Sequence, residues 1–323
     1  MHITPIEGKV FGAAVTDVDL SSLTDTDFAT IHHTLLDRGF LVFPGQHLSV
    51  DDNVAFGSRF GDLEFGGMPI ANVKVKNGRS TGEIIDFNSQ TMRTNVGNEN
   101  WHTDSTYKPI SSKCAMLSAA VVPTEGGETE LADARAGYAA LDSATQEKLR
   151  PLSAYHSTQY SQANDIGDFP EPPKDPGAYG SIYHGEAYLR PLVKIHPETG
   201  VPSLFCGRHA FGIPGMPREE SRALIRHLNE VVVADPSRTY VHHWAAGDTL
   251  LWDNRALLHR ARPYPYDQPR YMIATRVAGD ESELSYYPDA PEAEAGRRAL
   301  AEELTHLRQE AVDRLYGATT AIR

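Results

Sequence analysis

Short runs of β-forming residues recur along the sequence from residue 70 to residue 277, and turn residues separate them. Many short strands broken by Gly, Pro and Asn are typical of β-sandwiches and barrels. The predicted strands cover residues 70–75, 115–122, 192–195, 203–206, 240–244, 249–252 and 271–277. This pattern predicts a mainly β fold with flanking helices.

Helical periodicity marks the N-terminal part and three later segments. After short strand-like runs, a helical pattern begins at Asp25 or Thr26 and ends at Gly39, and Ser49 has the chemistry of an N-cap for the next helix. Apolar residues recur at helical spacing over 136–150, over 219–232 and over a C-terminal helix at about 292–317, which Gly317 would cap. We expect one catalytic domain over residues 1–323.

Residues 161–178 are rich in Gly, Pro, Asp and Asn. Such a composition, without a helical or strand period, predicts a long surface loop. The loop would be either a lid over a site or a mobile connection.

The negative net charge of the chain limits the classes of partner that it can bind. Its 30 basic and 43 acidic residues give a formal net charge of −13, whereas a nucleic-acid or anionic-membrane surface needs Lys and Arg in excess. Two cysteines indicate no disulfide framework, and neither a membrane span nor a secretion signal is visible. We expect a cytoplasmic protein with a small organic anion as ligand, no nucleic-acid or membrane partner, and a homo-oligomeric state.

The strongest local pattern is Trp101-His102-Thr103-Asp104. In a strand, residues i and i+2 face the same side, so His102 and Asp104 would direct one nitrogen and one oxygen at one point. His259 is the best candidate for a third ligand, because it follows the predicted strand 249–252. A His-x-Asp pair alone is a weak indication, since a chain with 14 histidines always offers a later one.

Two His and one carboxylate on one face of a metal leave open positions opposite, which is the facial triad of non-haem Fe(II) oxygenases. A 2-oxo acid can fill two of these positions and dioxygen the last. The same ligands would also suit zinc and hydrolysis, and a non-catalytic metal-binding protein is a further alternative. We expect Fe(II), 2-oxoglutarate and dioxygen as the reagents.

A 2-oxo diacid needs a cation for its distal carboxylate, preferably the fork of an Arg. Arg270 lies eleven residues after His259, at the start of the predicted strand 271–277. Thr129, which follows Gly126-Gly127-Glu128, can add a hydroxyl donor. A lone Arg is more often a surface ion pair and a lone Thr more often structural, so both matter only together with the His-x-Asp pattern.

Together these residues, with Trp252-Asp253-Asn254-Arg255, resemble the taurine dioxygenase family of Fe(II)- and 2-oxoglutarate-dependent dioxygenases. The order and spacing match from residue 3 to about residue 280. The resemblance implies a double-stranded β-helix (jelly roll) with helices packed around it. It also implies that His102, Asp104 and His259 bind iron, that Thr129 and Arg270 bind 2-oxoglutarate, and that Asn98 occupies a substrate-contacting position.

Two positions separate the chain from the taurine enzymes of that family. There, a His after the early Phe-Gly-acid-Leu sequence and an Arg four residues beyond the first Arg bind the sulfonate. Here Phe60-Gly61-Asp62-Leu63 is followed by Glu64, and the second Arg position is Ala274. Each lost charge-assisted hydrogen bond is worth about 1.5–3 kcal/mol, which argues against taurine as substrate.

Longer stretches resemble the aryloxyalkanoate branch of the family, at residues 104–107, 189–200, 207–210, 213–216 and 244–248. That resemblance implies hydroxylation of a C–H beside an ether oxygen, after which the hemiacetal collapses to a phenol. Succinate and CO₂ would be released from 2-oxoglutarate. A sulfonate, a sulfate ester or another carboxylate is the alternative substrate.

Four residues are predicted to contact the substrate. Asn98 and Ser105 flank the His-x-Asp pattern. Arg276 shares strand parity with Arg270, so it can replace the missing second Arg or pair with an acidic neighbour. His209 is either a pocket residue or a hydrogen-bonded structural His.

Overall fold

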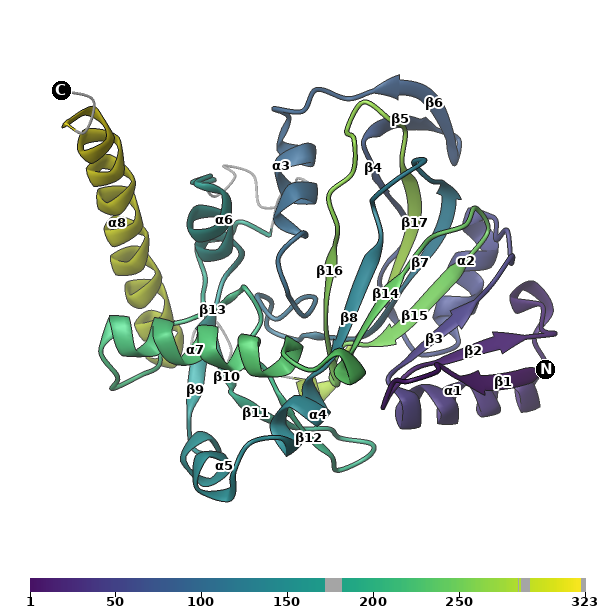
Figure 1. The fold of residues 1–323 in the computed structure, drawn as a ribbon, viewed down its shortest axis with the longest axis horizontal. Coiled ribbons are helices and arrows are strands. Elements are labelled where there is room, and N and C mark those ends of the chain that lie inside the picture. Colours follow the sequence, from purple (N-terminus) through teal and green to yellow (C-terminus); the bar gives the residue numbers. More distant parts are fainter. Residues whose placement is uncertain (172–181, 284, 286–290, 321–323) are drawn as a thin grey trace.

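The computed structural model describes residues 1–171, 182–283, 285 and 291–320 (Figure 1). Its largest sheet has seven strands in the order β1-β2-β3-β15-β7-β17-β4, and a sheet of three strands has the order β14-β8-β16. The large sheet contains β1 (His2–Pro5), β2 (Ala13–Thr16), β3 (Phe40–Phe43), β15 (Thr249–Asp253), β7 (Ser112–Val121), β17 (Tyr271–Ala278) and β4 (Leu63–Ala71). The small sheet contains β14 (Thr239–His242), β8 (Thr129–Asp133) and β16 (Leu257–Ala261). Two facing sheets with helices outside form the jelly roll that the sequence predicted.

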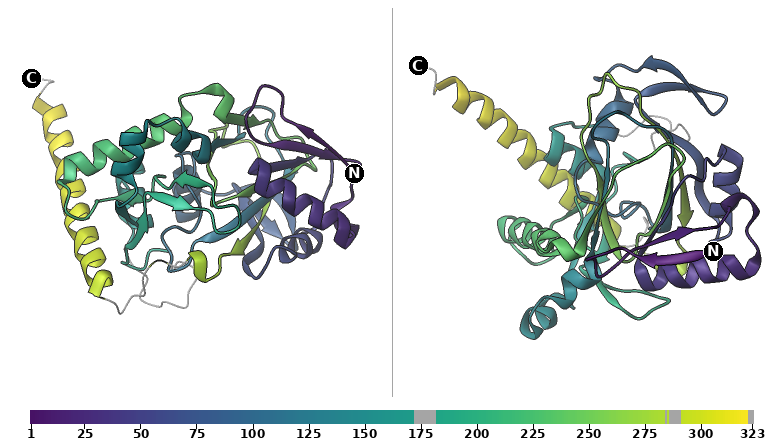
Figure 2. Two further views of the ribbon diagram at one scale, coloured as in Figure 1. Left: turned by 90° about the horizontal axis from the view of Figure 1, so that it is seen from below. Right: turned by 45° about the vertical axis from the view of Figure 1, so that its right-hand side comes forward.

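Smaller sheets and eight α-helices of the described chain surround these two sheets. The short strands are β5 (Val73–Lys76), β6 (Arg79–Ile84), β9 (Ser153–His156), β10 (Tyr188–Pro191), β11 (Val193–Ile195), β12 (Pro202–Leu204) and β13 (Ala210–Phe211). The helices are α1 (Asp25–Arg38), α2 (Val50–Ser58), α3 (Gln90–Gly97), α4 (Ala134–Ala139), α5 (Ser143–Leu149), α6 (Thr158–Ile166), α7 (Arg218–Val233) and α8 (Pro291–Thr320). Figure 2 shows α8 on the side of the molecule opposite the N-terminal strands.

The first two helices begin and end where the sequence predicted. Thr24 caps α1 by accepting a hydrogen bond from the backbone N–H of Asp27, and Gly39 ends it with a φ of 82°, a conformation that favours glycine. Ser49 caps α2 in a reciprocal capping box with Asp52. These helices pack Ile31, Leu35 and Phe56 into a core on the large sheet.

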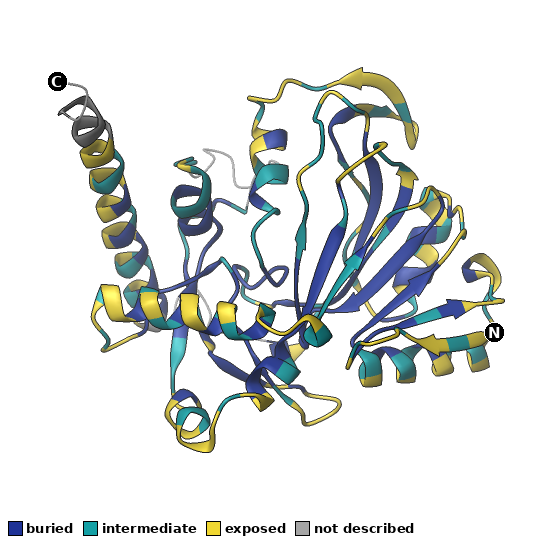
Figure 3. Cartoon of the chain, in the orientation of Figure 1, coloured by how far each residue is buried: buried dark blue, intermediate teal, exposed yellow. Residues whose placement is uncertain are grey.

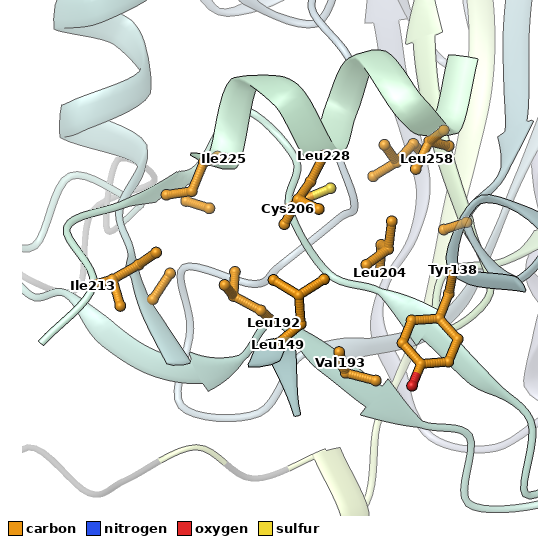
Figure 4. Close-up of a cluster of buried hydrophobic side chains, with 14 of the residues drawn as sticks. Tyr138, Leu149, Leu192, Val193, Leu204, Cys206, Ile213, Ile225, Leu228 and Leu258 are labelled. Atoms are coloured by element: carbon orange, nitrogen blue, oxygen red, sulfur yellow. The ribbon is translucent and has the colours of Figure 1, made fainter. Parts of the chain in front are cut away.

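The side chains of β16 alternate between two faces, which pack against different surroundings. Leu257 lies in the core between the sheets, while Leu258 faces outward into a second core. That outer core includes Leu228 of α7 and Leu204 of β12 (Figure 4). Because side chains alternate along a strand, His259 lies on the inner face with Leu257. Figure 3 shows β3, β15, β7, β17 and β8 largely buried, while the outward sides of α1 and α7 are exposed.

Tertiary contacts changed several sequence predictions. The single helix predicted over 136–150 is two helices, because Asp142 caps a new helix start at α5. The strand predicted over 70–75 breaks at Asn72 between β4 and β5. α8 continues past Gly317 to Thr320, so Gly317 does not cap it.

The predicted loop at 161–178 was wrong for its first part. Residues 161–166 belong to α6, which Ser157 caps, and Tyr160 and Ala163 of this helix pack against Leu300 and Leu307 of α8. Long-range apolar packing therefore made a helix from a polar sequence. Residues 172–178 lie outside the described part of the chain.

Cys114 and Cys206 are both buried and free. In the part of the chain that the structure describes, no helix combines the length and the apolar character that crossing a membrane requires. A single catalytic domain and a homo-oligomeric state stay predictions.

Candidate active site

His102, Asp104 and His259 converge on one point. One ligand atom from each lies within 4.8 Å of the others, and all three residues are buried. Nε2 of His259 is 3.5 Å from Oδ2 of Asp104, and Nε2 of His102 is 3.9 Å from Oδ1. Backbone hydrogen bonds in both directions, at 2.9 and 2.8 Å, pair His102 with His259. β16 is therefore held by β8 on one side and by His102 on the other.

The expectation that strand alternation brings His102 and Asp104 to one point was wrong. Only His102 forms a β-bridge, and the chain turns at once so that Ser105 has a φ of 57°. Asp104 therefore reaches the same point as His102 through a turn, not through strand alternation. The turn is stabilised by the bond from the Lys108 N–H to the Ser105 carbonyl at 3.0 Å.

The two imidazoles are prepared to act as neutral ligands. Nδ1 of His102 donates to the Asn100 carbonyl at 2.7 Å, because a carbonyl can only accept, and this leaves the Nε2 lone pair directed at Asp104. Burial lowers the pKa of His102 well below its usual value and that of His259 to about 3. Two neutral nitrogens and one carboxylate oxygen are the donor set of a facial triad, so these residues fit a divalent iron.

A cavity adjoins these three residues and lies between the two sheets. Residues of β7, β15 and β17 line one side of it, and residues of β8 and β16 line the other. The lining includes Phe65, Ile70, Asn98, Glu99, His102, Asp104, Met116, Thr129, Trp252, His259, Tyr264, Tyr266, Arg270, Ala274 and Arg276. Every residue predicted to bind iron or 2-oxoglutarate therefore faces the same cavity.

Arg270 is buried, with 6% of its surface exposed, just before β17. One guanidinium nitrogen, Nη2, donates to the Gly127 carbonyl at 3.1 Å, while Nε has no partner. No carboxylate of the described residues forms an ion pair with Arg270. Burial lowers its pKa below the usual range, and Tyr264, Glu128 and Glu99 offset this only in part.

Thr129 begins β8 and lines the same cavity. Its Oγ1 accepts a hydrogen bond from the indole nitrogen of Trp244 at 3.1 Å. A hydroxyl group carries one hydrogen and two lone pairs. The Thr129 hydroxyl therefore still has its own hydrogen to donate to an oxygen in the cavity.

Arg276 pairs with acidic neighbours, which is one of the two roles that the sequence left open, and it also lines the cavity. Its Nη2 donates to Oδ1 of Asp104 at 2.5 Å, and its Nη1 lies 3.5 Å from Oε1 of Glu64. Burial alone would lower the pKa of Arg276, but Asp104 and Glu64 outweigh burial and raise it. Lys108 also bonds Glu64, at 2.5 Å.

The other predicted substrate contacts lie at different depths. Asn98 lines the cavity directly. Ser105 and His209 are not among the described lining residues. Ser105 donates to Glu64 at 2.6 Å, while the His209 ring lies 6.0 Å from that of His102 and its Nδ1 is bonded to Ser161 at 2.9 Å. The structure therefore places both behind the triad.

Four residues of the site escaped prediction. Glu64 was noted only as the place of a missing His, yet it balances Arg276 and Lys108. Tyr264 and Tyr266 pack edge to face with ring centroids 4.8 Å apart, and the Tyr266 hydroxyl bonds Glu99. The alternation of two tyrosines before Arg270 was the one indication in the sequence that this segment lines a pocket.

The fold and the donor set of the site fit a mononuclear non-haem iron oxygenase with a cavity for an anionic cosubstrate. Comparison with known proteins supports the same class of enzyme. Residues 2–276 match the family model described as taurine catabolism dioxygenase TauD, TfdA family. The chain belongs to this family and is an Fe(II)- and 2-oxoglutarate-dependent dioxygenase, which sets aside the zinc hydrolase.

Curated relatives point to one branch of the family. The chain is 44% identical over 290 residues to a (S)-phenoxypropionate/alpha-ketoglutarate-dioxygenase of Delftia acidovorans, with 86% of this chain and 95% of the relative covered. It is 34% identical over 282 residues to the alpha-ketoglutarate-dependent 2,4-dichlorophenoxyacetate dioxygenase of Cupriavidus pinatubonensis, with 84% and 96% covered.

A solved structure shares the fold. The crystal structure of AAD-2 in complex with Mn(II) and N-oxalylglycine superimposes with a TM-score of 0.79 at 32% identity, covering 88% of this chain and 99% of that one. The predicted jelly roll is thereby confirmed by a protein that shares about a third of its residues.

Proposed function

We propose that His102, Asp104 and His259 hold the iron and that Arg270 and Thr129 hold 2-oxoglutarate. The observation that carries this proposal is Arg270, a buried guanidinium without a carboxylate partner that lines one cavity with the triad. A buried charge is costly unless it is paired. The distal carboxylate of 2-oxoglutarate would supply the missing anion, and the free hydrogen of the Thr129 hydroxyl would complete its binding.

The proposed substrate is an aryloxyalkanoate, with an (S)-2-aryloxypropionate as the first choice. The names of the most similar relatives support this, and so does the cavity wall. Phe65, Tyr264 and Tyr266 present aromatic surface to the cavity, which suits an aryl ring. Ala274 adds no second cation where taurine enzymes have one, which disfavours a sulfonate.

Bound iron would supply the activation of dioxygen that couples decarboxylation of 2-oxoglutarate to C–H hydroxylation. The protein residues position the reactants and exclude water. In balanced form, substrate, 2-oxoglutarate and dioxygen give hydroxylated substrate, succinate and CO₂. Hydroxylation beside the ether oxygen of an aryloxypropionate gives a hemiketal, which collapses to a phenol and pyruvate.

We assign the substrate carboxylate to Asn98 and Arg276, which both line the cavity. Asp104 and Glu64 hold Arg276 beside the triad, so that it brings a positive charge to the wall of the cavity. Ser105 and His209 would act on substrate indirectly, Ser105 through Glu64 and His209 through packing beside His102. Two buried, free cysteines are in keeping with the predicted cytoplasmic location.

The test is succinate and phenol formation from 2-oxoglutarate with Fe(II), ascorbate and air. The substrate panel holds both enantiomers of 2-phenoxypropionate, 2,4-dichlorophenoxyacetate, an alkyl sulfate and taurine. We expect equal amounts of succinate and phenol with the (S)-propionate, and no phenol under nitrogen. Succinate coupled only to the sulfate or to taurine would overturn the substrate assignment, and no succinate at all would overturn the function.

A further inference from the structure

Asn72 is a fully buried amide at the break between β4 and β5. Its side-chain nitrogen donates to the carbonyls of Tyr266 at 2.9 Å and Gln268 at 2.8 Å. Its side-chain oxygen accepts from the backbone N–H of Arg270 at 2.8 Å. Buried polar groups are normally bonded, and this side chain directs all of its bonds to the one segment 266–270.

The backbone of Asn72 adds two further bonds. Its N–H donates to the Arg270 carbonyl at 3.2 Å, so Arg270 is held on both its N–H and its C=O. The Asn72 carbonyl accepts from the Ile85 N–H at 2.8 Å. Ile85 directly follows β6, so Asn72 also fixes the end of the β5–β6 hairpin, which lies beside β4 and β17 in Figure 1.

The segment 266–270 depends on this clamp because it precedes the first ladder residue of β17. Without Asn72, the Tyr266 and Gln268 carbonyls and the Arg270 N–H would lose these partners. The Arg270 guanidinium cannot fix the backbone instead, because its protein hydrogen bond is a single contact to Gly127. The amide therefore holds the stretch of backbone from which the Arg270 side chain enters the cavity.

We propose that Asn72 is a positioning residue for the cosubstrate, acting through the backbone of Arg270. It is not among the described residues that line the cavity, so it would contact neither cosubstrate nor substrate. The inference rests on the proposed role of Arg270. It predicts that loss of the amide weakens 2-oxoglutarate binding selectively and leaves the three proposed metal ligands undisturbed.

The test is binding of 2-oxoglutarate to Mn(II)-loaded protein by calorimetry, for wild type and for Asn72→Leu. Leucine keeps the approximate volume and removes the amide. Removing residues that orient the ligands of a metal site typically costs about 10–100-fold in affinity or activity, and we expect the 2-oxoglutarate Kd to rise by a factor in the same range. The Mn(II) Kd should stay unchanged within the error of the titration, and kcat at saturating 2-oxoglutarate should be largely retained.

A matched control is Gln146→Leu. The Gln146 side-chain nitrogen also donates to two carbonyls, those of Tyr138 and Leu141, both at 3.1 Å, but it does so between α4 and α5. This variant should bind 2-oxoglutarate like wild type. If Asn72→Leu does not fold, Asn72→Asp keeps the acceptor for the Arg270 N–H while losing both donors, and should show a smaller rise in Kd.

Three results would decide the matter. A selective rise in the 2-oxoglutarate Kd supports the proposal. An unchanged Kd, or a parallel loss of Mn(II) binding, would show that Asn72 is only a structural residue. Failure of wild type itself to bind 2-oxoglutarate would instead refute the proposed function, and this inference with it.

Discussion

Arg255 and Arg270 are both buried, with 4% and 6% of their surfaces exposed, yet their surroundings differ. Arg255 forms a two-pronged ion pair with Asp253, at 2.9 Å from Nε to Oδ1 and 2.8 Å from Nη2 to Oδ2, and bonds Glu198 at 2.7 Å. His196 completes this closed ion cluster by bonding Asp253 at 2.9 Å. Among the described residues, Arg270 donates to one carbonyl and lies over the ring of Tyr264, while its Nε has no hydrogen-bond partner.

The comparison distinguishes a charge that stabilises the fold, that of Arg255, from a charge that we propose binds a ligand, that of Arg270. Burial alone would raise the pKa of Asp253, but Arg255 and His196 outweigh it and hold the pKa well below its usual range. The protein thus satisfies the closed ion cluster by itself. In the open pocket of Arg270, the burial is compensated only in part by Tyr264, Glu128 and Glu99, and under the proposed function the carboxylate of 2-oxoglutarate would supply the rest.

The largest expected effect is on succinate formation, when a residue that lines the cavity with Arg270 is replaced. Asp104→Ala removes the carboxylate of the triad, and succinate formation should fall to the background of iron and ascorbate alone. The melting temperature without metal should fall as well, because the variant removes one of the two carboxylates that pair with Arg276, and only Glu64 remains. Substantial succinate production by this variant would exclude Asp104 as an iron ligand.

Arg270→Leu tests the unpaired arginine. Truncating one partner of a buried, hydrogen-bonded charge pair costs about 2–5 kcal/mol, so KM for 2-oxoglutarate should rise by roughly 100-fold or more. The folded protein should be as stable as wild type, or more stable, because an unpaired buried charge is removed. A normal KM measured by 2-oxoglutarate titration would contradict the assignment.

Arg255→Leu tests the opposite case. It leaves Asp253 buried without its cation, and breaking a buried pair costs about 3–5 kcal/mol of unfolding free energy. Urea denaturation followed by circular dichroism measures this loss. If Arg255→Leu and Arg270→Leu change stability equally, the distinction between the closed ion cluster and the open pocket fails.

The smallest effect concerns pH. Because the folded pKa of Asp253 is depressed, its contribution to stability is present above the unfolded value of about 3.9 and is lost as the pH falls below it. The loss is at most about 1.4 kcal/mol per pH unit. The stability gap between wild type and Asp253→Asn, measured by urea denaturation, should therefore be constant from pH 7 to pH 5 and narrow below about pH 4. If the difference in stability widens in acid, the folded pKa of Asp253 is raised and not lowered.

Much of the fold was predictable because the signals are local. The β-forming runs at 249–252 and 271–277 became β15 and β17, and the caps at Ser49 and Gly39 lie where expected. The helix at 161–166 was not predictable, since its polar sequence becomes helical only against α8, which is distant in the chain.

The chemistry of this protein can be inferred from its amino-acid sequence alone. Residue types and spacings, taken together with the resemblance to a known family, single out His102, Asp104, His259, Thr129 and Arg270 as candidates. The grouping of these residues in one cavity follows from the two facing sheets. Local patterns carry this information because side-chain chemistry is a property of each residue alone.

Which charged and polar groups pair with one another depends instead on the tertiary fold. The fold pairs Arg276 with Asp104 and Glu64, turns the chain after His102, and breaks a strand at Asn72 to clamp Arg270. Each of these outcomes depends on residues far apart in sequence that meet through strand pairing. A local sequence pattern cannot predict these contacts, because the packing of the whole molecule determines which groups a buried polar side chain bonds.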